Sequence, residues 1–163
     1  MAPLTTGLRV EFDQVNKISL MRVEGRLTDE SLADLYEASR KHSTATDARV
    51  SIVDLLSVTE FALSPRFIKH LAGQKPAMAD AHRLCFIVAP EGYAFGLCRM
   101  FQLLGEATRP LLQIVHTLGE AFAAIGIQSP NFEPLVVLAP FRAGGPAPII
   151  VQDIREVVSL SKP

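Results

Sequence analysis

Residues 50–76, VSIVDLLSVTEFALSPRFIKHLAGQKP, decide the fold that the sequence predicts. The opening segment VSIVDLL is apolar on both alternating faces, which is typical of a strand covered by helices on both sides. Ser64 is a favoured helix N-cap and Pro65 suits the first helical position, so a helix begins there after a short loop over 57–61. Open α/β sheets meet ligands and partners at this kind of strand–loop–helix corner.

Upstream of this corner, the sequence predicts a β-hairpin followed by a helix. Alternating apolar and charged residues over 8–13 indicate a half-buried strand, and a second strand over 17–23 pairs back with it. Gly25 is expected to end the second strand. Thr28 precedes two acidic residues and a helical apolar pattern, so a helix begins there and ends at the basic residues 40–42. The hairpin is expected at an antiparallel edge of the sheet.

Downstream of the corner, strands and helices alternate. Strands are predicted over 84–89 and 111–115, and helices over 93–105 and 118–126. Strands separated by single helices are parallel and joined by right-handed crossovers. The predicted fold class is therefore α/β, with a mixed, mostly parallel five-stranded sheet and about four helices in β-β-α-β-α-β-α-β-α order.

The pattern of the chain changes after residue 127. Prolines recur and Gly144-Gly145 adds a flexible joint, but the apolar runs 135–138 and 149–151 argue against a plain disordered tail. We predict a domain over 1–127 and a Pro-rich C-terminal arm over 128–163. The arm lies over the domain or over a partner subunit, and a partly ordered extension is an equal alternative.

Composition excludes several classes of function. With 163 residues and a net charge of -1, the chain has the size of one domain and no basic excess for nucleic acid. No run approaches the roughly 20 apolar residues of a membrane span, and the N-terminus has no signal-peptide pattern. A cytoplasmic protein is expected. Cys85 and Cys98 are not at metal-ligand spacing and are predicted to be buried, reduced thiols.

The sequence offers no pattern of catalytic residues. Its four histidines have no HxxH or HxxxH spacing, no serine lies in a GxSxG motif, and no Gly-rich loop has phosphate-binding spacing. We therefore predict no catalytic residue, no metal, no cofactor and no enzymatic activity.

The order of elements resembles the SpoIIAA-like, or STAS-like, superfamily of small bacterial domains, including its solitary members. The matching residues are the buried strand ending in IVDL at 52–55, the segment 57–61, the helix that begins at Ser64, and GLCRMFQ at 96–102. The resemblance covers residues 8–127. It implies a regulatory domain that binds a protein partner.

In the anti-sigma-factor antagonists of this superfamily, the second helix begins at an Asp-Ser-Ser/Thr-Gly motif whose serine is phosphorylated. Here ALSP stands at 62–65, so the aspartate and the glycine are absent. The resemblance marks Ser64 as a possible phosphorylation switch, although an N-cap role explains it fully. Asp54 matches the aspartate after the family's strand, and a carboxylate bound to loop N–H groups is the alternative.

The helix over 93–105 is apolar at almost every position, whereas a helix that packs on a sheet needs only an apolar stripe. The large apolar residues of this helix are therefore not all expected to face one core: Tyr93, Phe95, Met100, Phe101 and Leu104. The arm, a second subunit or a ligand covers the second face, unless its apolar residues are simply exposed. Arg99 forms a local salt bridge or holds an anionic group. Gln102 ends the segment that resembles the solitary family members.

Three functions follow from these observations. The first is a non-enzymatic interaction domain, homodimeric through the third helix. The second is a carrier of a small apolar or lipid ligand, lined by aromatic residues of that helix. The third is a phosphorylation-controlled regulator acting at Ser64. The candidate interaction residues are Asp54, Ser64, Tyr93, Arg99, Phe101 and Gln102.

Overall fold

The structure, a computed structural model, describes residues 6–43, 46–76, 83–141 and 150–153. Its strands are β1 (Thr6–Asp13), β2 (Ile18–Thr28), β3 (Val50–Ala62), β4 (Leu84–Val88), β5 (Leu112–Val115), β6 (Glu133–Phe141) and β7 (Ile150–Asp153). Its helices are α1 (Asp29–Ser43), α2 (Pro65–Ala72), α3 (Tyr93–Leu104) and α4 (Leu118–Ala124). None of these helices combines the length and the apolar character that crossing a membrane requires.

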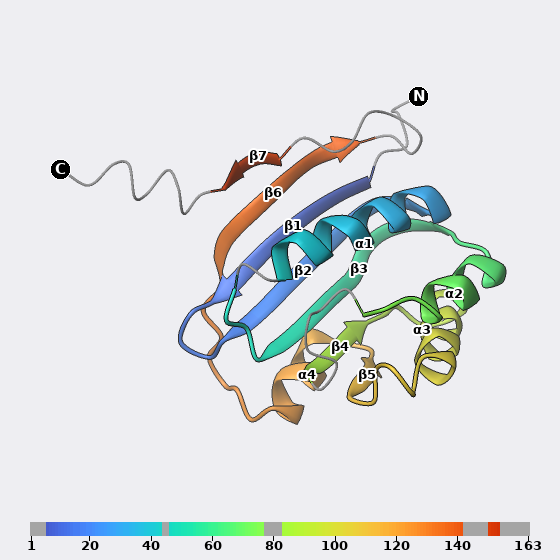
Figure 1. The fold of residues 1–163 in the computed structure, drawn as a ribbon. Coiled ribbons are helices and arrows are strands. Elements are labelled where there is room, and N and C mark those ends of the chain that lie inside the picture. The colour runs from blue at the N-terminus through green and yellow to red at the C-terminus, as the bar shows by residue number, and fades with distance from the viewer. Residues whose placement is uncertain (1–5, 44–45, 77–82, 142–149, 154–163) are drawn as a thin grey trace.

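The strands form one sheet in the order β5-β4-β3-β2-β1-β6-β7 (Figure 1). Strands β2 to β5 are parallel, and β1 is antiparallel to both β2 and β6. Each step from β2 to β5 moves in the same direction along the sheet. Right-handed crossovers therefore place α1, α2 and α3 on one face. Helix α4 packs on the other face, through Ala121.

The predicted fold class is confirmed, because the β-β-α-β-α-β-α-β-α order runs unbroken from β1 to α4. The sheet is wider than the five predicted strands. Strand β6, which lies within the segment predicted as an arm, pairs with β1, so the hairpin is not at the edge of the sheet. Leu135 of β6 is buried in the same core as Leu8 of β1, which accounts for the apolar run there. Residues 142–149 and 154–163 of the predicted arm lie outside the described residues.

Strands β2 and β3 extend beyond the predicted corner. The loop expected over 57–61 is part of β3, and Leu27 and Phe61 are partners in the register of the two strands. Gly25 does not end β2 but adopts a φ of 84° where the register shifts, a conformation that glycine accepts readily. Burial of Val58 in the core explains why this apolar segment pairs instead of looping.

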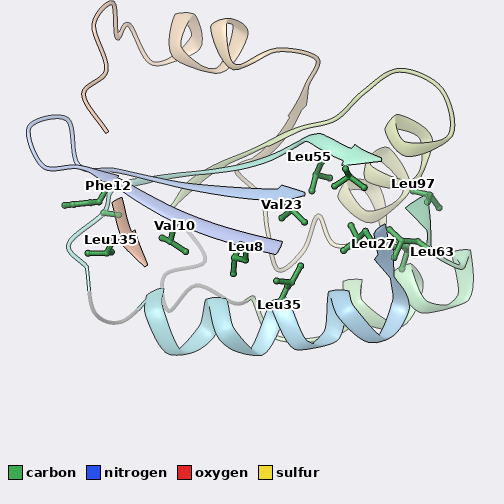
Figure 2. Close-up of a cluster of buried hydrophobic side chains, with 13 residues drawn as sticks. Leu8, Val10, Phe12, Val23, Leu27, Leu35, Leu55, Leu63, Leu97 and Leu135 are labelled. Atoms are coloured by element: carbon green, nitrogen blue, oxygen red, sulfur yellow. The ribbon is translucent and has the colours of Figure 1, made fainter. Parts of the chain in front are cut away.

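The two faces of the sheet carry separate cores. On the face covered by α1, α2 and α3, Leu8, Val10 and Val23 point toward Leu35 of α1 (Figure 2). On the other face, residues such as Ile52 and Phe86 pack beneath α4. Because α4 is short, it covers only part of that face, and charged residues occupy positions further along the same strands.

Candidate functional site

An apolar cavity of about 230 Å³ lies between the sheet and helices α1, α2 and α3. Strands β2 to β5 form most of its floor, with Val10 of β1 and Leu135 of β6 at one side, and the three helices form its roof. For comparison, an engineered apolar cavity of about 150 Å³ in another protein admits benzene. A space of this size in the main core distinguishes this domain from a fully close-packed one.

The floor of the cavity changes from polar to apolar along the strands. Its first row consists of neighbours in the strand register: Ser19, Ser51, Cys85 and Leu112. Two residues further along the same strands, the second row is Met21, Val53 and Ile87. Alternation places both rows on the face that the helices cover. The polar row lies toward the amino ends of the parallel strands, and the apolar row toward their carboxyl ends.

The helices of the roof also change from polar to apolar lining residues in the same direction as the floor. The first half of α1 contributes Leu32 and Leu35 to the lining, whereas its second half contributes Tyr36 and Ser39. Beyond the second floor row, the lining includes the half-buried ring of Phe61 and these buried residues: Leu27, Leu63, Ile68, Ala94 and Leu97. At the other end the lining includes Thr108, which is exposed. The cavity is therefore closed at its apolar end and reaches the surface at its polar end.

Arg109 holds the polar end together. Its guanidinium donates to the carbonyl oxygens of Ala72 (3.0 Å) and Gln74 (3.1 Å) and to the hydroxyl of Tyr36 (3.1 Å). The same group lies 4.8 Å from the ring centroid of Phe101. A cation at the C-terminal carbonyls of a helix is favourable, because the helix dipole is negative there. One side chain thus joins α1, α2 and α3 around the cavity.

Two thiols belong to the lining. Burial raises the pKa of Cys85 to about 12, although the guanidinium groups of Arg109 and Arg83 lower it in part. Burial also raises the pKa of Cys98 to about 12. Both groups are therefore uncharged near neutral pH, and they line the cavity as small apolar side chains.

Asp54 lies on the opposite face of the sheet from the cavity. Its buried carboxylate accepts a hydrogen bond from the backbone N–H of Leu56 (2.9 Å) and lies 3.5 Å from Nη1 of Arg22. Arg22 also pairs with Glu11 on β1, at 2.7 Å. The local hydrogen bond matches the alternative interpretation of Asp54, except that the N–H belongs to a strand. Any regulatory role of Asp54 stays a prediction.

Ser64 is the N-cap of α2, and its hydroxyl accepts a hydrogen bond from the N–H of Phe67 (3.1 Å). The hydroxyl also donates to Oδ2 of Asp29 (2.7 Å), and the backbone N–H of Ser64 donates to Oδ1 (2.9 Å). Tyr93 donates its hydroxyl to the carbonyl of Leu63 at 2.9 Å. The starts of α1, α2 and α3 are therefore joined at this point. Phosphorylation of Ser64 stays a prediction.

Helix α3 presents its apolar residues to two different environments. Phe101 lines the cavity, whereas Tyr93, Leu103 and Leu104 are 58%, 63% and 50% exposed. Strand β6 lies across the sheet, beside β1, so this part of the predicted arm does not cover α3 (Figure 1). We call the surface formed by Tyr93, Leu103 and Leu104 the α3 outer face.

The other two residues predicted on α3 make local contacts. Arg99 donates to the side-chain oxygen of Gln102, an amide and not the predicted carboxylate or anion. Gln102 donates in turn to the carbonyl of Leu112 at 2.7 Å. These bonds join α3 to the start of β5. Their part in binding a partner stays a prediction.

Of the residues that define the cavity, the sequence indicated Phe101 but not those of the floor or Arg109. Met21, Val53 and Ile87 have the pattern of ordinary core residues, and Arg109 lies in a turn with no motif. The pairing of Ser19 with Ser51 could have given a signal, since two serines on the covered face of adjacent strands are unusual for a close-packed core. In the part of the chain that the structure describes, no cluster of histidine, cysteine or acidic residues is arranged to hold a metal.

Comparison with known proteins finds likeness among solved structures. An anti-sigma factor antagonist from Mycobacterium paratuberculosis is 24% identical with a TM-score of 0.49, and the match covers 77% of this chain and 97% of that one. The anti-sigma factor antagonist SpoIIAA in its unphosphorylated form is 12% identical with a TM-score of 0.49, covering 75% and 99%. No family model and no curated protein matches the chain.

Proposed function

We propose that this protein binds a small apolar ligand in the cavity between the sheet and helices α1, α2 and α3. The observation that carries the proposal is the cavity itself, about 230 Å³ lined mainly by apolar side chains of nine secondary-structure elements. Protein interiors are normally packed as densely as organic crystals, and an unfilled space of this size loses dispersion contacts. A ligand that fills the space would restore those contacts.

Binding in such a site needs no catalytic group. Transfer of apolar surface from water contributes about 25 cal/mol per Å² buried, so a ligand with most of its surface enclosed gains several kcal/mol from burial alone. The Arg109 contacts hold the three roof helices at the open end of the cavity. The proposed role is therefore a carrier or sensor of the ligand, which fits the prediction of a non-enzymatic domain.

Filling the cavity with a side chain tests this function. Val53 lies in the second floor row, and Val53→Phe places a ring in the space that the ligand would occupy. Leu56→Phe is the matched control, because Leu56 is an exposed residue of the same strand. We expect wild-type protein and Leu56→Phe to enhance the fluorescence of Nile red, a neutral apolar dye, and Val53→Phe to lose most of that enhancement.

Circular dichroism and thermal unfolding must show that Val53→Phe is folded. A folded Val53→Phe protein that binds the dye as tightly as wild type would contradict the proposal. So would wild-type protein that binds neither the dye nor any apolar molecule, both when titrated and when analysed by native mass spectrometry after purification from cells.

A second candidate function is self-association or partner binding through the α3 outer face. The supporting observation is that three large side chains on one helix are each half or more exposed. Apolar groups that gather on a surface mark interaction sites more often than scattered ones do. We propose a second copy of the chain as the occupant, in line with the homodimer predicted from the sequence.

Leu103→Glu tests this second function, because an unpaired charge buried in an apolar dimer interface is strongly unfavourable. Val15→Glu is the matched control, since Val15 is an exposed apolar residue in the turn between β1 and β2. Light scattering should show a wild-type dimer that Leu103→Glu converts to a monomer and Val15→Glu leaves intact. A monomeric wild type would contradict self-association. Phe101 is unsuitable for this test, because it lines the cavity.

A further inference from the structure

We infer that the ligand of this cavity is a single-chain amphiphile with an anionic head group. Its head lies beside Arg109 at the open end, and its tail lies toward Leu27 and Leu97 at the closed end. This inference rests on the proposed function and adds to it the chemical class and the orientation of the ligand.

The orientation of the ligand is inferred from the lining of the cavity, which is polar at one end and apolar at the other. The polar lining residues gather at the open end: Ser19, Ser39, Ser51, Tyr36, Thr108 and Arg109. The closed end is lined by apolar side chains, among them the buried residues Leu27, Leu63 and Leu97 and the half-buried ring of Phe61. Several of these polar groups have protein partners of their own, such as the carbonyl of Leu35 for Ser39 and that of Gly105 for Thr108, and they can border the hydrated head of a ligand. A polar head at the other end would be buried without hydrogen bonds, at a cost in free energy. A molecule with one polar end matches both halves.

The evidence that the head group is anionic comes from Arg109. Its contacts with described residues are all to neutral groups: backbone carbonyls, two hydroxyls and an aromatic ring. The guanidinium therefore brings a positive charge to the cavity without a carboxylate among those contacts. Its Nε–H makes no hydrogen bond to a described residue and can donate to a ligand. A second guanidinium, that of Arg83, also lines the cavity.

An anion at this position would gain more than it would at the protein surface. Charge-assisted hydrogen bonds are roughly twice as strong as neutral ones, and the partly buried setting weakens the screening by water. Guanidinium geometry suits a carboxylate or a phosphate equally well. The head group inferred here is therefore an oxyanion, and the experiment below distinguishes a carboxylate from a phosphate.

The volume limits the tail to one chain. Pockets for drug-sized molecules measure roughly 300 to 1,000 Å³, and this cavity measures about 230 Å³. A single acyl chain can lie along the floor from the serine row past Met21 and Val53 to the closed end. A second chain would need space that the described side chains occupy.

The test compares head groups on one tail. Dodecanoate, dodecyl phosphate, dodecanol and methyl dodecanoate each compete with Nile red on the full chain, at concentrations below micelle formation. We expect an anionic form to displace the dye at a concentration about tenfold lower than the neutral forms, the effect of roughly one charge-assisted hydrogen bond. The better of the two anionic forms identifies the head group as a carboxylate or a phosphate.

Variants then locate the head group. Arg109→Gln should remove most of the preference for the anion, Arg109→Lys should retain part of it, and Arg66→Gln, a change at an exposed residue of α2, should leave it unchanged. If Arg109→Gln does not fold, Arg83→Gln takes its place. Native mass spectrometry of the wild type, which needs no variant, shows directly whether the anionic compounds bind in preference to the neutral ones.

Three other outcomes would contradict, in turn, the anionic head group, its position beside Arg109 and the binding function itself. Equal displacement by the acid, the alcohol and the ester would overturn the anionic head and leave the apolar-ligand function standing. A preference for the anion that survives both Arg109→Gln and Arg83→Gln would overturn the orientation. Wild-type protein that binds neither Nile red nor any of the four compounds, as tested by native mass spectrometry, would overturn the proposed function itself.

Discussion

At the scale of single residues, Asp13 joins parts of the chain that are far apart in sequence. Its buried carboxylate accepts hydrogen bonds from the N–H groups of Val15 (3.0 Å), Asn16 (2.9 Å) and Asn131 (3.0 Å). The side chain of Asn16 donates a further bond at 2.7 Å. The turn after β1 is thereby tied to the segment that leads into β6.

Asp13 should make stability depend on pH. Burial raises the pKa of its carboxyl, but the hydrogen bonds outweigh burial, so the pKa lies below its ordinary value of 3.8. The stabilisation is therefore fully present above the unfolded pKa and is lost as pH falls through the folded pKa. Urea unfolding should show wild-type stability declining below about pH 4, with a smaller decline in Asp13→Asn. An identical decline in both proteins would contradict this role.

Ser64 gives a second prediction at this scale. Ser64→Ala removes the cap of α2 and one hydrogen bond to Asp29, so the free energy of unfolding should fall by about 1 to 2 kcal/mol. Ser64→Thr keeps a hydroxyl and should lose less. Urea denaturation measures both changes, and Ser57→Ala on the exposed part of β3 is the control. An effect of Ser64→Ala no larger than that of the control would show that the cap is unimportant.

At the scale of elements, β4 and α3 each contribute one thiol to the cavity. Because burial raises the pKa of Cys85 and Cys98 to about 12, the thiolate is scarce near neutral pH and should grow only as pH approaches that value. Iodoacetamide should therefore modify the folded protein slowly at pH 7 and rapidly in urea, as followed by mass spectrometry. A bound ligand should slow the reaction further. Equal rates for folded and unfolded protein would contradict the protection of these two half-buried thiols by the fold.

Some helices and strands could be predicted from the sequence and others could not. The start of α2 at Ser64 and the alternation in β1 depend on neighbours in the chain, so the sequence reveals them. Strand β6 was missed because Pro134 suggests a break, whereas the structure pairs Pro134 with Glu11 beside a shift in register. A ligand site lined by aromatic residues of the third helix was one prediction, but the floor of the cavity was not predicted, because a cavity depends on how side chains from separate elements meet. A residue such as Val53 has the same local pattern whether it contacts a neighbour or a ligand.

At the scale of the whole molecule, the sheet continues past β1 into the C-terminal segment. Leu135 of β6 is buried in the main core. Leu135→Ala should therefore lower the free energy of unfolding by about 2 to 5 kcal/mol, the usual cost of such a truncation in a core. Leu104→Ala, at a half-exposed site on α3, should change it by less than about 0.5 kcal/mol. Denaturant titration compares the two. Equal, small effects would show that β6 is dispensable to the domain.

The cavity also has a mechanical consequence. Unfolding eliminates internal voids, so a protein with an unfilled core has a larger negative volume change on unfolding and yields more readily to hydrostatic pressure. If the proposed ligand fills the cavity of about 230 Å³, the loaded domain should be less compressible than the empty one. Compressibility would therefore report occupancy, and the loaded domain would be the stiffer body that a partner meets.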